Sequence, residues 1–181
     1  NLNNPWSLTF INENEILISE KAGLLILYNK STNKKSSIPH NLRFNDNGQG
    51  GFLEVLKFKE DIYLCYSEVR ESGRTSTSIA KAKFSNKDLN FKNIFQAKSP
   101  IDSGYHFGCR MVIQDEKYLY ASIGERGQGM IAQDPTQHPG SIIRINVDGS
   151  IPKNNPKFDG KPNWLPEIYQ IGIRNPQGMT L

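Results

Sequence analysis

The chain has 181 residues and a formal net charge of +4, a length that suffices for one buried core. Its Lys and Arg residues are spread along the chain instead of forming a basic block with interleaved aromatic residues, so nucleic-acid binding is not expected. No apolar run approaches the roughly 20 residues of a membrane-spanning helix, and no charged start before an apolar stretch marks a signal peptide.

The predicted elements are short strands, and no segment shows convincing helical periodicity. In chain order, runs rich in β-branched and aromatic residues lie at 15–19, 24–28, 62–66 and 118–123. Compact polar turns of hairpin length lie at 12–14, 59–61, 115–117 and 148–149. The pattern predicts an all-β fold.

A weak repeat of about 50 residues organises these strands. Each unit has an apolar run ending near Phe10, Phe58 or Ile113, then a polar turn and a second strand. Third strands are expected at 24–28, 78–84 and 141–146, and fourth strands around Ile38, Ile94–Phe95 and Ile168–Tyr169. Four antiparallel strands per unit are typical of a propeller blade, with a β-sandwich as the alternative.

The repeat predicts about three four-stranded antiparallel blades. Their expected bounds are about 1–46, 47–104 and 105–173, with the start of a fourth blade at 174–181. Closed propellers have four to eight blades, so the chain is expected to be a fragment of a longer protein. The alternative is a homodimer in which two copies close a six-bladed ring.

The two cysteines and three histidines show no metal-binding spacing. Cys65 and Cys109 lie inside apolar strand-like runs and are interpreted as small buried thiols, with a disulfide left open. A count of two argues against a disulfide-stapled secreted scaffold. His40 precedes a turn and shows no partner in the sequence, and a structural role is expected for His138.

Three polar segments could carry chemistry. The segment Gly172–Gly178 combines the permanent charge of Arg174 with the amides of Asn175 and Gln177 in a Pro- and Gly-containing turn, which suits a planar anionic ligand. His106 is the best candidate for catalysis, because an imidazole is the usual general base for removing a hydroxyl proton, and nearby glycines permit close approach of a ligand. The alternatives are a surface loop with a structural Arg and an ordinary loop histidine.

Two glycine-rich segments lie upstream of the last turn. Gln49 stands in the turn 47–53, where its amide could reach a central cleft; the alternative is a plain hairpin turn. The segment 124–129 follows a strand without a helical pattern after it, so it is interpreted as a loop at the top of the propeller and not as a dinucleotide site.

The order of five motifs resembles the glucose/sorbosone dehydrogenase family of soluble quinoproteins, and its aldose sugar dehydrogenase branch in particular. These motifs are Pro5–Phe10, Asn47–Leu53, Tyr105–Met111, Ile145–Pro152 and Gly172–Gly178. The resemblance runs from Pro5 to Leu181 and covers only the first half of what the family needs. It therefore implies a partial six-bladed β-propeller.

The resemblance also implies an activity, which is oxidation of the anomeric carbon of an aldose by hydride transfer to pyrroloquinoline quinone. His106 would be the base, and Arg174 and Asn175 would bind the quinone carbonyl oxygens, with Arg174 stabilising the negative charge that develops. Gln49 and Gln177 would contact the cofactor region. Calcium is implied too, with ligands expected beyond this chain, so the chain alone is expected to hold half a site and to be inactive.

The sequence leaves several points open. In soluble glucose dehydrogenases an acidic residue directly precedes the base, whereas Tyr105 stands there in this chain, which puts the strength of His106 as a base in doubt. A non-catalytic binding propeller and a metal-dependent lactonase-like propeller are the alternative functions. The resemblance alone implies a periplasmic or secreted location, and the electron acceptor is not indicated.

Overall fold

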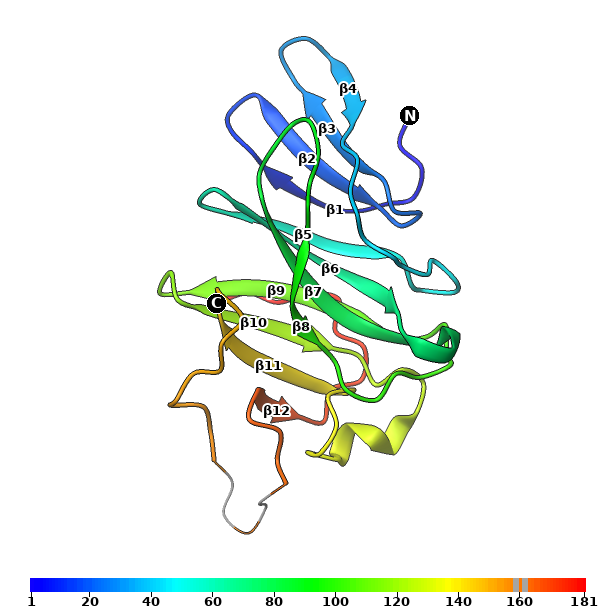
Figure 1. Cartoon of the computed structure of the whole chain (residues 1–181), viewed down its shortest axis with the longest axis vertical. Coiled ribbons are helices and arrows are strands. Elements are labelled where there is room, and N and C mark those ends of the chain that lie inside the picture. Colours follow the sequence, from blue (N-terminus) through cyan, green and yellow to red (C-terminus); the bar gives the residue numbers. More distant parts are fainter. Residues whose placement is uncertain (158–159, 161–162) are drawn as a thin grey trace.

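Three four-stranded sheets follow one another along the chain in the computed structural model, which describes residues 1–157, 160 and 163–181 (Figure 1). The first sheet holds β1 (Pro5–Phe10), β2 (Glu15–Glu20), β3 (Leu25–Asn29) and β4 (Lys34–Ser37). The second holds β5 (Phe52–Phe58), β6 (Asp61–Val69), β7 (Thr75–Lys83) and β8 (Lys92–Gln96). The third holds β9 (Gly108–Gln114), β10 (Tyr118–Ile123), β11 (Ser141–Asn146) and β12 (Ile168–Ile171).

Each sheet is antiparallel, and strands that are consecutive in the chain are neighbours in the sheet. This order confirms the predicted all-β fold of three four-stranded propeller blades and excludes the β-sandwich. The 3₁₀ helices η1 (Glu71–Gly73) and η2 (Gly129–Gln133) lie between strands. Residues 174–181 form no strand. Among the residues described, no helix has the length and apolar character needed to cross a membrane.

Two apolar cores separate the three sheets. The first lies between the first and second sheets and includes Leu17, Leu25 and Leu64, and the second lies between the second and third sheets and includes Ile79, Leu119 and Ile143. The second sheet is covered on both faces, which explains why most of β6 is buried and lacks the apolar–polar alternation of a half-exposed strand.

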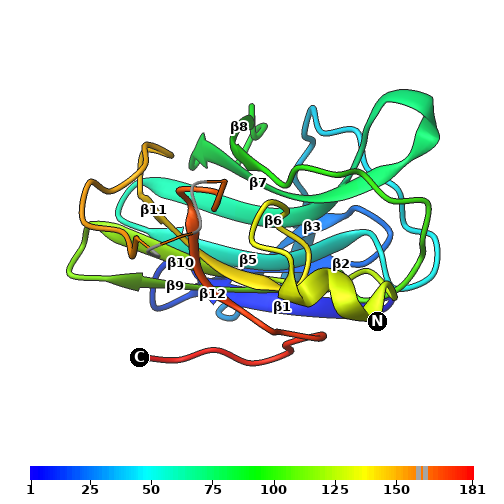
Figure 2. The ribbon, with the colours of Figure 1, turned by 90° about the horizontal axis from the view of Figure 1, so that it is seen from below.

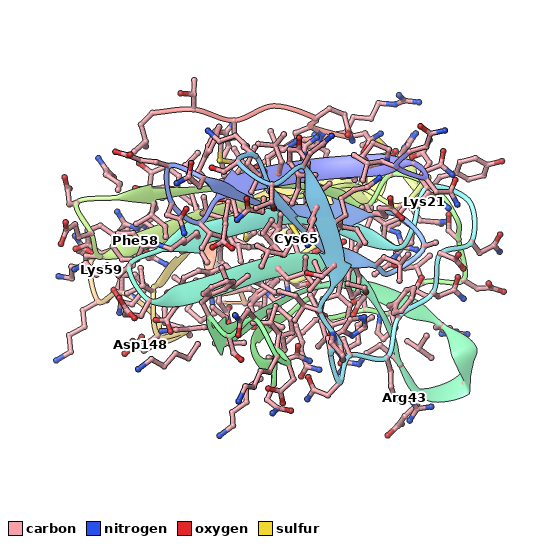
Figure 3. The ribbon with its side chains drawn as sticks, turned by 90° about the horizontal axis from the view of Figure 1, so that it is seen from above. Lys21, Arg43, Phe58, Lys59, Cys65 and Asp148 are labelled. Atoms are coloured by element: carbon pink, nitrogen blue, oxygen red, sulfur yellow. A yellow bond between two sulfur atoms is a disulfide. The ribbon has the colours of Figure 1, made fainter. Side chains whose placement is uncertain are left out.

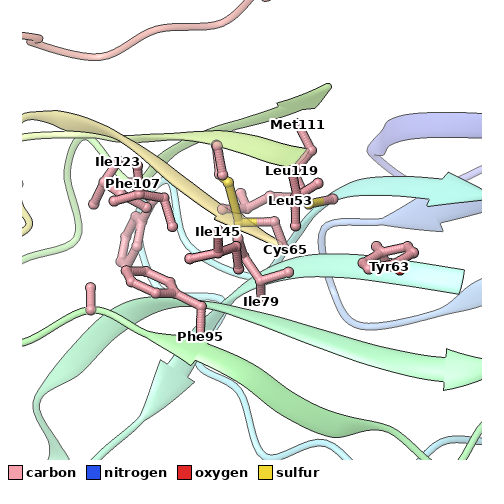
Figure 4. Packing of buried hydrophobic residues seen from close by; sticks show 14 residues of the cluster. Leu53, Tyr63, Cys65, Ile79, Phe95, Phe107, Met111, Leu119, Ile123 and Ile145 are labelled. Atoms are coloured by element: carbon pink, nitrogen blue, oxygen red, sulfur yellow. A yellow bond between two sulfur atoms is a disulfide. The ribbon is translucent and has the colours of Figure 1, made fainter. Parts of the chain in front are cut away.

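Cys65 and Cys109 form a disulfide across the second core, with their Cα atoms 6.4 Å apart. Both side chains are buried, as the sequence indicates, but the interpretation as free thiols is wrong. The bond joins β6 to β9, and Cys65 lies inside the stack of sheets (Figure 3). Apolar side chains such as Leu53 and Ile145 surround it (Figure 4). The sequence places each cysteine in a strand, but pairing depends on two sheets packing face to face.

The first strand of each sheet lies beside the first strand of its neighbour, so β1, β5 and β9 line one edge of the stacked blades. After β12 the chain turns back and its C-terminal segment runs past this edge (Figure 2). The predicted Arg174–Gln177 turn therefore lies alongside the start of β9, although the two are far apart in sequence.

Candidate functional site

The β9–β10 hairpin brings a carboxylate to His106. Gly108 pairs with Ile123, and the same register continues beyond the strands, where the Arg126 N–H donates to the His106 carbonyl oxygen at 3.2 Å. This register sets Glu125 opposite His106. The Nδ1 atom of His106 hydrogen-bonds to Oε1 of Glu125.

The environment of Glu125 keeps this carboxyl ionised. Its side chain is only 3% exposed, and burial opposes the charge, but hydrogen bonds from the His106 ring and from the Gly129 N–H outweigh burial and lower the pKa of Glu125. An ionised carboxylate only accepts hydrogen bonds, so Nδ1 of His106 carries the proton. The lone pair of Nε2 is then available to take a proton from a ligand.

A buried arginine supports the loop that carries His106. The guanidinium of Arg126 donates to the carbonyl oxygens of Ser103, Tyr105 and Thr75, and it lies over the ring of Phe107 with 3.6 Å to the centroid. Burial lowers the pKa of Arg126 to about 10, so it stays charged at neutral pH. The loop just before β9 is thereby tied to the second sheet.

Gln49 contacts the backbone at His106. Its Oε1 accepts the His106 N–H at 2.9 Å, and its own N–H donates to the Gly104 carbonyl oxygen at 2.7 Å. These bonds require the two loops to lie close together, and a Cβ on Gly48 would lie 2.4 Å from the Gly104 oxygen. The Gln49 side chain therefore orients the histidine in this structure.

The Arg174–Gln177 turn is bonded to the same hairpin. The Glu125 N–H donates to the Arg174 carbonyl oxygen at 2.8 Å, and the Gly108 N–H donates to Oδ1 of Asn175 at 3.3 Å. The Nε2 of Gln177 donates to the same Asn175 oxygen at 3.0 Å. The Arg174 side chain is exposed, and its guanidinium makes no hydrogen bond or ion pair within the described residues.

The structure therefore gathers the predicted residues Gln49, His106, Asn175 and Gln177 around one hairpin, with Arg174 at its rim. It adds Glu125, which the sequence predicts only as part of a top loop. Tyr105, and no carboxylate, directly precedes His106; the carboxylate that contacts His106 comes from across the hairpin. An acidic residue just after the strand that pairs with the histidine's strand is the signal that could have identified it.

The other two histidines have structural partners. Nε2 of His40 lies 2.8 Å from the Gly23 carbonyl oxygen, so the interpretation that it lacks a partner is wrong. His138 is buried, accepts the Lys98 N–H at Nδ1, and has Nε2 3.5 Å from a Glu167 oxygen. These hydrogen bonds hold the two rings in the scaffold.

The fold and the site define a partial β-propeller in which a carboxylate-paired histidine lies beside an Arg-Asn-Pro-Gln turn. The family described as Glucose / Sorbosone dehydrogenase matches residues 2–181, and the chain belongs to this family.

Sequence relatives and solved structures agree with this family assignment. The chain is 32% identical to the aldose sugar dehydrogenase YliI of Escherichia coli (strain K12), over 99% of this chain and 51% of that protein, and 28% identical to quinoprotein glucose dehydrogenase B of Acinetobacter calcoaceticus, over 99% of this chain and 44% of that protein. The crystal structure of the soluble aldose sugar dehydrogenase from Escherichia coli in its apo form superposes with a TM-score of 0.91 over 99% of this chain and 54% of that one, at 32% identity. The chain thus spans about half the length of these relatives.

The residues of the turn fit an anionic quinone better than they fit a metal ion. Arg174 offers a guanidinium that has no partner within the described residues, and Asn175 and Gln177 offer amide groups that can hydrogen-bond to carbonyl or carboxylate oxygens. Within the described part of the chain, no three His, Cys, Asp or Glu side chains gather as ligands of a metal ion. Calcium ligands outside this chain remain a prediction.

Proposed function

We propose that this chain supplies the base and part of the quinone-binding surface of a quinoprotein dehydrogenase that oxidises the anomeric carbon of aldoses. The contact between His106 and the buried carboxylate of Glu125, at the hairpin that holds the Arg174–Gln177 turn, is the observation that carries this proposal. The names of the relatives support the substrate class.

His106 would act through Nε2. Glu125 holds the proton on Nδ1 and stabilises the imidazolium that forms when Nε2 takes the proton of the anomeric hydroxyl group. Gln49 fixes the backbone of His106, and Arg126 holds the loop on which it stands. Pyrroloquinoline quinone, when bound, would supply the acceptor for the hydride that leaves the anomeric carbon.

The turn would hold the cofactor. The permanent charge of Arg174 stabilises negative charge on a ligand oxygen without exchanging a proton. Asn175 and Gln177 already hydrogen-bond to each other, and Asn175 bonds to Gly108, so the turn keeps its shape before a ligand arrives. The pyrroloquinoline quinone-bound form of the aldose sugar dehydrogenase from Streptomyces coelicolor shares the fold, with a TM-score of 0.80 at 23% identity.

We also propose that the protein works in the periplasm or outside the cell. The Cys65–Cys109 disulfide supports this location, because such bonds persist in oxidising compartments and are rare in the cytosol.

A turnover assay on the full-length protein tests the function. We expect the protein, given pyrroloquinoline quinone and calcium, to oxidise an aldose and reduce an artificial electron acceptor. An equilibrium titration with the quinone separates the alternatives, because a non-catalytic binding propeller would bind without turnover. Absence of turnover would contradict the proposal, whether or not the quinone binds.

A further inference from the structure

The first strands of the second and third sheets are distorted at the same place. In β5, two residues, Leu53 and Glu54, face one residue of β6, and in β9 Cys109 and Arg110 face the single residue Ser122. Such β-bulges change the direction of a side chain and are over-represented beside active sites. Here they place Glu54 and Arg110, two residues of opposite charge, on neighbouring first strands.

Arg110 contacts the turn that would bind the quinone. Its Nε donates to the Gln177 carbonyl oxygen at 2.8 Å, which links residues 67 positions apart. Its own N–H donates to Oγ of Ser122 at 2.9 Å, so the backbone of the bulge is held at the same time. The side chain of Arg110 and the N–H of Gly108 thus both tie β9 to the turn.

Glu54 contacts the strand at the next residue. Oε2 of Glu54 accepts the N–H of Met111, and the positive charge of Arg110 acts on the same carboxyl. Burial raises the pKa of Glu54 to about 7 against the effects of that hydrogen bond and that charge. A half-buried acid at this position costs stability, which indicates a role other than packing.

We propose that Glu54 and Arg110 form a positioning pair for the cofactor. Glu54 holds the backbone of β9 at Met111, next to Arg110. Arg110 in turn holds the Gln177 carbonyl oxygen and thereby fixes the turn that carries Arg174 and Asn175. Both residues act through the turn and not on the substrate, so they are positioning residues. The inference rests on the proposed quinone site.

The test is a double-mutant cycle on the full-length protein, read out as the dissociation constant for pyrroloquinoline quinone in the presence of calcium. Arg110→Met is expected to weaken quinone binding roughly ten-fold or more, the usual effect of losing a hydrogen bond from a charged group. Glu54→Gln is expected to weaken it less. The double variant should bind no worse than Arg110→Met, because the two residues act as one unit.

Two readouts separate positioning from a general structural role. The KM for the aldose at saturating quinone should stay unchanged in both single variants, and Arg110→Lys should recover part of the lost affinity because it keeps the charge and one donor. Arg70→Met and Glu68→Gln are the matched controls, since that part-buried pair lies at 3.3 Å at the end of β6, and among the described residues neither side chain has a hydrogen bond or ion pair with residues 174–177. If Arg110→Met does not fold, Arg110→Lys takes its place in the cycle.

The outcomes are distinguishable from those of the proposed function. Suppose that the wild type binds the quinone and the variants bind it with the same affinity, or that the losses of binding free energy in the two single variants add up in the double variant. Either result would overturn the positioning pair alone. A wild-type protein that binds no quinone would overturn the proposed function and the positioning pair with it.

Discussion

The pairing of His106 with Glu125 decides which nitrogen of the imidazole can act. A histidine without a carboxylate partner exchanges between two tautomers, and only one of them leaves Nε2 free. Glu125 is buried, ionised and held by the Gly129 N–H, so it fixes Nδ1 as the protonated atom. Tyr105 stands where soluble glucose dehydrogenases have an acidic residue, and in this chain a carboxylate reaches His106 from Glu125 instead.

Replacing Glu125 by Gln should lower kcat of the full-length enzyme by on the order of 100-fold or more, because the amide no longer stabilises the imidazolium or selects the tautomer. Glu116→Gln is the control, since Glu116 is exposed and pairs with Lys59 on the surface. A Glu125→Gln enzyme with wild-type kcat would contradict the assigned role.

The same variant has a pH signature in stability. The folded-state pKa of Glu125 lies below its unfolded value, so its contribution is present above pH 4.5 and is lost as the pH falls through the folded pKa. We therefore expect urea midpoints of the wild type to fall more steeply below about pH 4.5 than those of Glu125→Gln.

His106 and the turn can be found from the sequence, because each lies in a short segment of unusual composition. Glu125 cannot be found in the same way. It is 19 positions from His106, and their contact depends on the register of β9 against β10, which the bulge at Arg110 alters. Residue types indicate which groups can react, but register decides which groups meet.

At the scale of elements, the hydrophobic runs and turn residues predict most strands well. The third strand of the third sheet lies at 141–146 as expected, and the fourth strands of the second and third sheets contain the expected apolar residues. The fourth strand of the first sheet is less predictable. It occupies Lys34–Ser37, just before the expected Ile38. All four of its residues are polar and exposed, so no apolar run marks this strand in the sequence.

The disulfide between β6 and β9 joins the second blade to the third, close to the loop of His106. Its cysteines are 44 positions apart, so a loop-closure estimate gives about 4 kcal/mol of stabilisation. We expect the double variant Cys65→Ala/Cys109→Ala to lose a comparable free energy of unfolding, measured by urea titration.

Addition of a reductant serves as the control for the disulfide. It should destabilise the wild type and leave the double variant unchanged. Equal unfolding midpoints of the wild type with and without reductant would show that the bond does not form in solution, and would remove the support it gives to an oxidising compartment.

At the scale of the whole molecule, the site arises because three blades meet along their first strands. The loops before β5 and β9 and the C-terminal turn come from three separate parts of the chain, yet hydrogen bonds join all of them at His106 and its hairpin. The blade repeat is visible in the sequence, whereas the convergence of these loops requires the packed arrangement of the blades. The relatives are about twice as long as this chain, so we expect the remaining part of the cofactor site to come from further blades of the propeller.

The most direct test of the account is single-turnover reduction of bound pyrroloquinoline quinone by an aldose, followed by absorbance in the full-length wild type and in His106→Asn. The account predicts that both proteins bind the quinone with similar affinity, and that the variant reduces it at least about 100-fold more slowly, a typical effect of losing a general base. Reduction at the wild-type rate in His106→Asn would contradict the account.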